Sequence, residues 1–79
     1  MKNVKILLDS IDKVKQFVNA ITLFDFDFDL ISGRYVIDAK SIMGIFSLNL
    51  SDPIELAIHT TDEKAIEQVM EVIAPYIVE

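Results

Sequence analysis

Three groups of side chains in this sequence have the chemistry of a functional site. Ser41 carries a hydroxyl at the start of the apolar run SIMGIF, where it can cap a helix or accept a phosphoryl group. His59 is the single histidine, a residue type that can act as a general base or a phosphoryl acceptor. Carboxylates able to bind a metal ion alternate with phenylalanines in FDFDFD, at Asp25, Asp27 and Asp29.

For the aspartates and the histidine, a structural explanation is favoured. On a strand, side chains at positions i and i+2 lie about 6.5–7 Å apart, too far to share one ion without ligands from a neighbouring strand. Asp38 is the one further carboxylate expected near Asp25, Asp27 and Asp29. His59 has no partner for a proton relay nearby in the sequence. We therefore expect a solvent-facing row of aspartates, a partly exposed histidine and no bound metal.

The sequence also lacks the usual parts of an enzyme. Cysteine is absent, so neither a thiolate nucleophile nor a disulfide is available. Gly33 and Gly44 stand alone, so no glycine-rich loop can cradle a phosphate. One histidine without a local partner does not make a catalytic triad. We predict a protein that works by binding partners, without catalysis of its own and without a cofactor.

Ser41 differs because both of its interpretations have a physical basis. As an N-cap, its hydroxyl accepts a backbone N–H, which stabilises a helix by about 1 kcal/mol. A phosphate on the same oxygen would lie beside backbone donors at the positive end of that helix. It would also place negative charge next to Ile42, Met43 and Phe46, and so could switch a protein interface. From the residues alone, both interpretations stay open.

Length and composition limit the class of protein. The 79 residues, 52% of them hydrophobic, suffice for one domain, residues 1–79, held together by burial. A net charge of -6 argues against nucleic acid and anionic membranes as partners. No stretch reaches the roughly 18 apolar residues of a membrane span, and no signal peptide is recognisable. We expect a cytoplasmic protein.

Alternation of apolar and polar residues predicts the strands that position these side chains. In FDFDFDL, the phenylalanines and Leu30 would point to one face and the aspartates to the other. Ser32-Gly33 is typical of a tight turn between this strand and the next. The predicted strands cover residues 4–8, 24–30, 34–38 and 54–59.

Helical spacing predicts two long helices. Ser10 caps the first, whose apolar stripe is Ile11, Val14, Phe17, Val18 and Ile21. Thr60 and Glu63 have the spacing of a capping box for the second, which continues to residue 73. A short helix follows Ser41. Together these elements predict an α+β fold, an open-faced β-sandwich with a four-stranded antiparallel sheet covered on one face by two long helices plus a short helix.

The segment AKSIMGIFSL resembles the regulatory-serine segment of HPr, the phosphocarrier protein family of the sugar phosphotransferase system. In that family a Lys-Ser pair opens a short helix and Ile-Met-Gly follows. The motif here is KSIMG, and the order of elements is similar over nearly the whole chain. The resemblance implies that Ser41 is the serine phosphorylated by HPr kinase/phosphorylase. It also implies that Lys40, Ile42, Met43 and Phe46 contact partner proteins.

One segment departs from the family pattern. HPr proteins carry a phosphoryl group on a histidine at the start of the first helix, whereas the corresponding stretch here is DSIDKVKQF. Asp9, Ser10 or Asp12 occupies the vacant place, depending on the alignment. The pattern is similar to the catabolite-repression paralogue of HPr in Gram-positive bacteria, which also lacks the histidine and keeps the serine. The resemblance therefore implies a regulatory protein controlled through Ser41.

Three hypotheses about function follow. The first is a regulatory protein that binds phosphotransferase-system enzymes, HPr kinase/phosphorylase or a transcriptional regulator through the Ser41 segment. The second is a phosphocarrier that uses another acceptor, such as His59, Asp9 or Asp12. The third is a structural module that forms a homodimer and is not phosphorylated.

Overall fold

The computed structural model describes residues 2–78 as a four-stranded antiparallel sheet with helices on one of its faces. The strands lie side by side in the order β1-β4-β2-β3. Along the chain the elements are β1 (Lys2–Ile6), α1 (Ile11–Ile21), β2 (Phe28–Ser32), β3 (Tyr35–Asp38), α2 (Ile42–Phe46), β4 (Ile54–Ile58), α3 (Glu63–Ile73) and a 3-10 turn (Ala74–Tyr76). The predicted α+β open-faced sandwich is confirmed.

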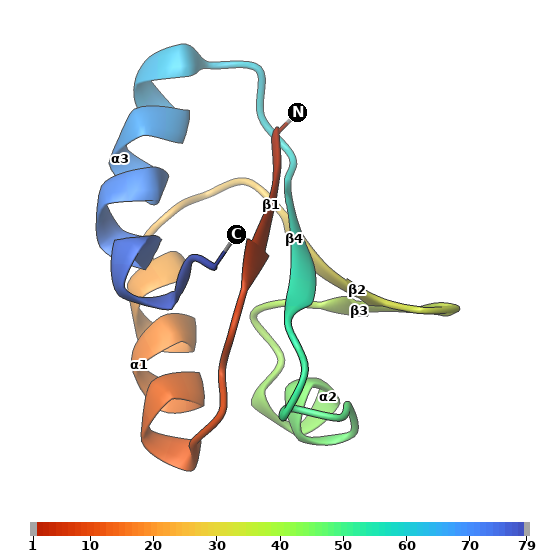
Figure 1. Cartoon of the computed structure of the whole chain (residues 1–79). Helices are drawn as coiled ribbons and strands as arrows, with labels where there is room; N and C mark the ends of the chain where they lie inside the picture. Colours follow the sequence, from red (N-terminus) through yellow and green to blue (C-terminus); the bar gives the residue numbers. More distant parts are fainter. Residues whose placement is uncertain (1, 79) are drawn as a thin grey trace.

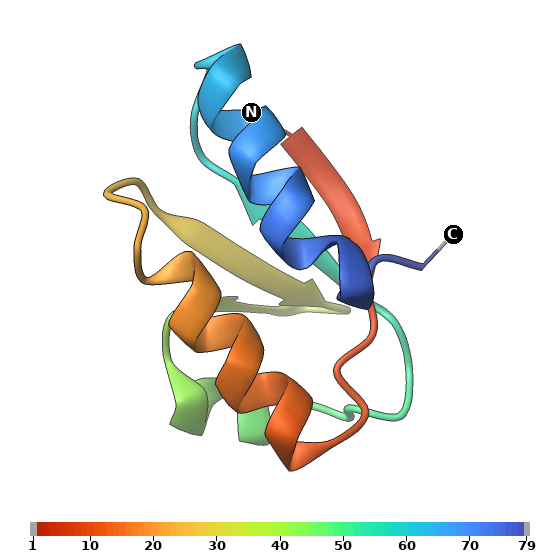
Figure 2. The same ribbon diagram turned by 90° about the vertical axis from the view of Figure 1, so that its left-hand side faces the viewer.

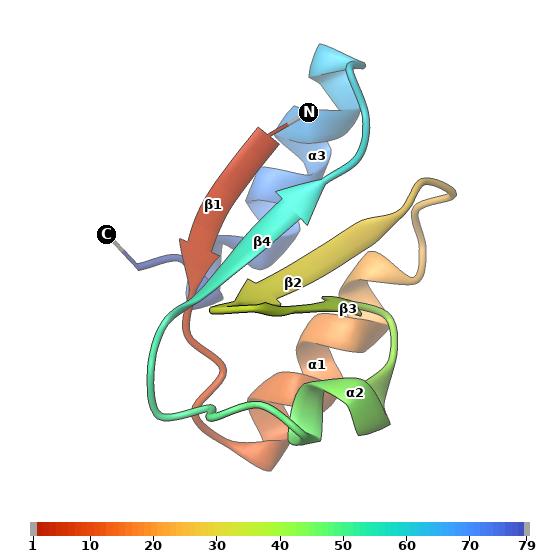
Figure 3. The same cartoon turned by 90° about the vertical axis from the view of Figure 1, so that its right-hand side faces the viewer.

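The helices α1 and α3 cover the same face of the sheet, and the other face carries no helix (Figures 1 and 2). Side chains that alternate along β2 and β4 point to the helices and are fully buried, among them Phe28, Leu30, Leu56 and Ile58. Burying one such side chain contributes roughly 1.5–3 kcal/mol. Their neighbours on each strand face the open side, which Figure 3 shows in front of the helices.

Helix α1 begins where the sequence predicts. The Ser10 hydroxyl accepts the Lys13 N–H at 3.1 Å, and Val14, Phe17, Val18 and Ile21 are buried. The first member of the predicted apolar stripe is an exception, because Ile11 is 61% exposed.

The cap of α3 differs from the prediction. Asp62, not Thr60, is the N-cap, and its carboxylate accepts the N–H groups of Lys64 and Ala65. The Thr60 hydroxyl instead accepts the Asp62 N–H at 3.2 Å, two residues before the cap. The predicted Thr60–Glu63 capping box was therefore wrong.

The strand predicted over residues 24–30 begins only at Phe28. Residues 22–27 form the turn that brings the chain from α1 back to the sheet. Phe24 and Phe26 still pack against the core, and their ring centroids lie 5.5 Å apart. The alternation of Phe and Asp thus reflects a loop that turns its aromatic rings inward, followed by a short strand.

The β2–β3 hairpin closes with Ser32 opposite Tyr35. Gly33 has φ +60°, a conformation that glycine adopts without steric cost and that a two-residue hairpin turn with glycine first requires. A tight turn follows β2 as predicted, but its two residues are Gly33 and Arg34, one position later than the predicted Ser32-Gly33, and β3 begins at Tyr35. Within residues 2–78, no helix has the length and apolar content needed to cross a membrane.

Candidate functional site

Ser41 lies between the end of β3 and the start of α2. Its backbone N–H donates to the Asp38 carbonyl at 3.0 Å, which turns the chain out of the strand. Its hydroxyl accepts the Gly44 N–H at 3.2 Å, and its carbonyl accepts the Ile45 N–H at 3.0 Å. Ser41 is thus the N-cap of α2, as predicted.

Gly44 leaves room beside the Ser41 hydroxyl. A Cβ atom on Gly44 would lie 3.2 Å from Ser41 Oγ and 3.5 Å from Ile37 Cδ1. The first distance is tighter than an ordinary contact, so a side chain at Gly44 would crowd the hydroxyl. The presence of glycine at this position of the KSIMG motif is therefore explained locally, because any side chain would reduce the space around the Ser41 hydroxyl oxygen.

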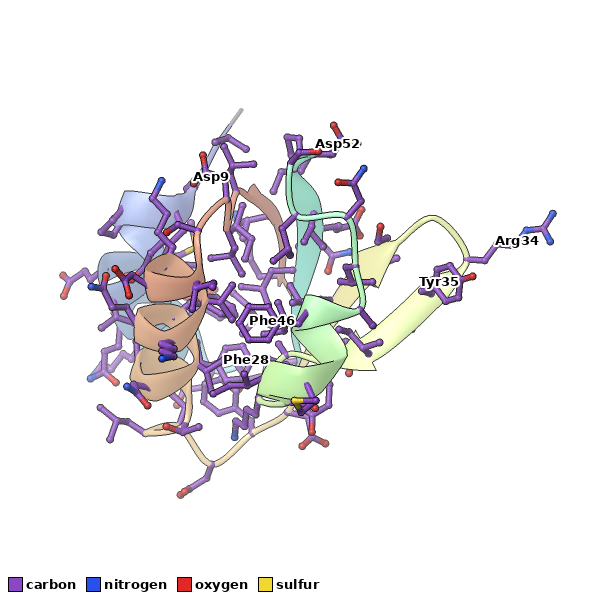
Figure 4. The ribbon with its side chains drawn as sticks, turned by 90° about the horizontal axis from the view of Figure 1, so that it is seen from below. Asp9, Phe28, Arg34, Tyr35, Phe46 and Asp52 are labelled. Carbon is purple, nitrogen blue, oxygen red and sulfur yellow. The ribbon has the colours of Figure 1, made fainter. Side chains whose placement is uncertain are left out.

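Helix α2 presents apolar side chains to solvent on both sides of an anchoring residue. Ile45 is fully buried and fixes the helix to the core, while Met43 is 81% and Phe46 39% exposed. Ile42 is half-buried against the core. We call Ile42, Met43 and Phe46 the α2 patch. In Figure 4, Phe46 lies on the side of α2 that faces α1.

Lys40 makes contacts that its place in the motif does not predict. Its ammonium donates to the Phe24 carbonyl at 2.7 Å and lies 5.6 Å from the centroid of the Phe28 ring. Its backbone N–H donates to the Asp38 carboxylate at 2.9 Å. Lys40 thus ties the α2 segment to the loop after α1.

The start of α1 lies at the same end of the molecule as α2 (Figure 1). Here the Lys13 ammonium donates to the Asp9 carboxylate at 2.9 Å. This hydrogen bond and the charge of Lys13 lower the pKa of Asp9 below its usual value of 3.8. Asp12 adds a second carboxylate to the first turn. The stretch that would hold a phosphocarrier histidine therefore carries acids, one of them already paired with a lysine.

Solved structures of HPr proteins resemble the chain over nearly its whole length, among them the following two. HPr-C-His from Thermoanaerobacter tengcongensis has a TM-score of 0.74 and 28% identity, and the match covers 94% of this chain and 92% of that one. A phosphocarrier protein HPr from Bacillus anthracis str. Ames has a TM-score of 0.65 and 26% identity, and covers 91% and 93%. No protein-family model matches the sequence, and no curated protein matches it either.

In fold and in sequence the chain resembles HPr phosphocarrier proteins over nearly its whole length. The predicted resemblance is confirmed, and so is the relation to proteins of the phosphotransferase system that it implied. The roles of Ser41, Lys40 and the α2 patch stay predictions, to which the structure adds geometry.

The single histidine of the chain lies far from the start of α1, the place of the carrier histidine in HPr proteins. His59 directly follows β4, where the chain leads to the start of α3, and α1 starts at the other end of the molecule (Figure 1). Its Nε2 lies 2.8 Å from an Asp29 carboxylate oxygen. The two residues are 30 positions apart, so only the pairing of β2 with β4 brings them together.

His59 and three carboxylates line a depression on the open face of the sheet. The carboxylates belong to Asp27, Asp29 and Asp38. Asp29 and Asp38 face each other directly across the β2–β3 pair. Among residues 2–78, however, no three such side chains converge as ligands of one metal ion. We call these residues the acidic depression.

Proposed function

We propose that this HPr-like protein is a regulatory partner in the sugar phosphotransferase system, controlled by phosphorylation of Ser41. The observation that carries the proposal is the position of the Ser41 hydroxyl at the start of α2, with Gly44 leaving space beside it and Met43 and Phe46 exposed nearby. In the reaction, Ser41 Oγ forms a bond to the γ-phosphorus of ATP, the bond to ADP breaks, and the hydroxyl proton passes to the kinase.

A phosphate on Ser41 is compatible with the folded state. The hydroxyl oxygen already accepts the Gly44 N–H, and an ester oxygen at the same place can keep that bond. The first turn of α2 contains no acidic residue that would repel the new charge. We therefore expect α2 to remain folded after modification.

The same phosphate changes what the α2 patch presents to a partner. It adds about −1.5 to −2 units of charge at pH 7, beside Met43 and Phe46, which are exposed. A partner that binds the bare apolar surface would lose affinity, and one with an arginine or lysine opposite Ser41 would gain it. Enzymes of the phosphotransferase system, HPr kinase/phosphorylase and a transcriptional regulator are the partners that the family suggests.

Intact-mass measurement after incubation with HPr kinase/phosphorylase and ATP tests the proposal. We expect one added phosphate on the wild type and none on Ser41→Ala. Ser47→Ala is the matched control, because Ser47 is the C-cap of the same short helix and should not affect labelling. Equal labelling of wild type and Ser41→Ala, or none on either, would overturn the proposal.

The alternative to this regulatory function is a phosphocarrier that uses another acceptor residue. The charges around His59 weigh against this alternative. Asp29 binds the His59 ring, and Asp27 and Asp38 line the same depression. A phosphate on His59 would therefore be repelled by three carboxylates. Asp9 is paired with Lys13. Transfer of labelled phosphate from phosphoenolpyruvate through Enzyme I would support the carrier, and a protein that stays unlabelled would exclude it.

A further inference from the structure

The two edges of the sheet are protected to different degrees. Along the outer side of β1 runs the C-terminal segment, in which the Val78 N–H donates to the Lys5 carbonyl at 2.9 Å and Ile77 bridges to Ile6. At the other edge β3 is the last strand in the order. Tyr35 and Val36 on β3 are 70% and 62% exposed. An edge of this kind can pair with a further strand.

We propose that the β3 edge pairs with the β3 edge of a second copy of this chain. The backbone has the groups that such pairing needs. The Ala39 N–H donates to the Phe28 carbonyl at 2.9 Å, so Ala39 faces β2. Because backbone groups alternate along an antiparallel strand, Tyr35 and Ile37 also face β2, whereas Val36 and Asp38 turn their backbone groups outward.

Symmetry restricts how two copies can pair. In a continuous twofold sheet, residues opposite each other must project from the same face, so even-numbered β3 residues meet even-numbered ones. With Val36 on the axis, it exchanges backbone hydrogen bonds with Val36 of the second copy. Tyr35 then lies opposite Ile37 of the second copy. Arg34, the turn residue that directly precedes β3, comes next to Asp38 of the second copy, within reach of its long side chain. The segment Arg34–Asp38, RYVID, is complementary to itself in this register.

Charge favours this register over the alternatives. The Arg34 side chain points away from the tip of the hairpin, where it can reach another molecule (Figure 4). Shifting the axis by one position places Arg34 or Asp38 opposite Val36, and both ion pairs are lost. Shifting it further places like charges opposite each other, which destabilises a sheet. Only the Val36 register joins the two chains by two reciprocal ion pairs.

The acidic depression provides a second reason for a cation at Asp38. Asp38 and Asp29 lie directly opposite each other, with Asp27 nearby, and His59 is bonded to Asp29. Carboxylates placed opposite each other on one face repel. His59 already binds Asp29. The guanidinium of Arg34 from a second copy would lie beside the other carboxylate of the pair, Asp38, and so reduce the repulsion.

The interface is short, and association should be weak and reversible. Beyond Asp38 the chain turns away, because the Asp38 carbonyl accepts the Ser41 N–H. A strand of four residues covers less surface than the roughly 1,200–2,000 Å² of a standard stable interface. We expect a dimer that forms at high protein concentration. It does not depend on phosphorylation of Ser41, so the two proposals can fail independently.

Sedimentation velocity over a wide range of protein concentration tests the dimer. We expect the wild type to shift from monomer to dimer as concentration rises. Arg34→Glu should raise the dissociation constant tenfold or more, because both ion pairs become repulsive. Lys64→Glu is the matched charge reversal on α3, away from β3, and should leave the dissociation constant unchanged.

Mixing two variants gives the sharper test. Arg34→Glu and Asp38→Lys each disfavour their own homodimer, but a mixed dimer restores an opposite charge at both positions. We expect dimers to reappear in the mixture, and circular dichroism checks that Asp38→Lys, which loses a turn hydrogen bond, is folded. A wild type that stays monomeric, or a dimer that tolerates Arg34→Glu, would refute the β3 interface. A dimer weakened by Arg34→Glu but not recovered in the mixture would refute the register.

Discussion

Two serines cap two helices at the same end of this molecule, and the surroundings of the two caps differ. Ser10 starts an eleven-residue helix with four buried residues, and Ser41 starts a five-residue helix with one. Asp9 and Asp12 flank Ser10, whereas the first turn of α2 has no acidic residue. The same hydroxyl geometry thus occurs once among charged residues, two of them acidic, and once beside an apolar first turn. A capping serine is suited to take up a phosphate only where its neighbours tolerate the charge.

The largest expected effect concerns how firmly each helix is held. Helix α2 depends on one buried side chain, so Ile45→Ala should lower the free energy of unfolding by about 2–5 kcal/mol. Met43→Ala on the same helix should change it by no more than about 0.5 kcal/mol, because Met43 is exposed. Urea denaturation of both variants measures the difference. Equal losses would mean that α2 is anchored in some other way.

The next effect compares the two caps directly. Ser10→Ala and Ser41→Ala each remove an acceptor for a backbone N–H, and each should cost about 1 kcal/mol. Because α1 buries more side chains that depend on its first turn, we expect the larger loss at Ser10. Thermal unfolding under identical conditions ranks the two variants. A larger loss at Ser41 would contradict the view that its hydroxyl is the less structural of the two.

These caps illustrate what the sequence makes predictable. Ser10 and Ser41 each bond a residue three positions ahead, so a local pattern was sufficient to predict both. The same local rule chose Thr60 where Asp62 is the cap, because several residues in that stretch can accept a hydrogen bond. The motif and the order of elements were sufficient for the fold and the resemblance to HPr proteins.

Contacts between distant residues were beyond this kind of prediction. Lys40 reaches the carbonyl of Phe24, 16 residues away, because the loop after α1 folds over the α2 segment. Asp29 meets His59 only through the register of β2 against β4. The alternation in FDFDFD also predicted correctly that the phenylalanines point to the core. It did not show that the first half of the segment would be a loop and not a strand. Sequence patterns report which way side chains point, and the register decides what they meet.

A smaller difference in stability is expected when each capping serine is replaced by aspartate, a change that separates the effect of charge from that of the hydrogen bond. Aspartate caps a helix about as well as serine, so replacing either serine by aspartate keeps the cap and adds a negative charge. Ser10→Asp brings a charge next to Asp9 and Asp12, whereas Ser41→Asp brings one to an acid-free first turn. We expect Ser41→Asp to be the more stable variant by about 0.3–1 kcal/mol. Added salt should narrow the gap, since it screens exposed charges, and an unchanged gap would assign the difference to packing.

The smallest effect tests the ion pair that makes the start of α1 different. Lys13 lowers the pKa of Asp9 in the folded protein below 3.8. An aspartate with a depressed folded pKa contributes stability above its unfolded pKa of about 3.9, and that contribution is lost as pH falls through the folded pKa. Lys13→Met should therefore return the pKa of Asp9 toward 3.8 and weaken the acid sensitivity of unfolding below about pH 4.

Lys15→Met is the control on the same helix, since the Asp9 pair involves Lys13 alone. NMR titration of the Asp9 carboxyl carbon reads the shift, and an unchanged pKa in Lys13→Met would show that the carboxylates at this cap are not neutralised by the lysine.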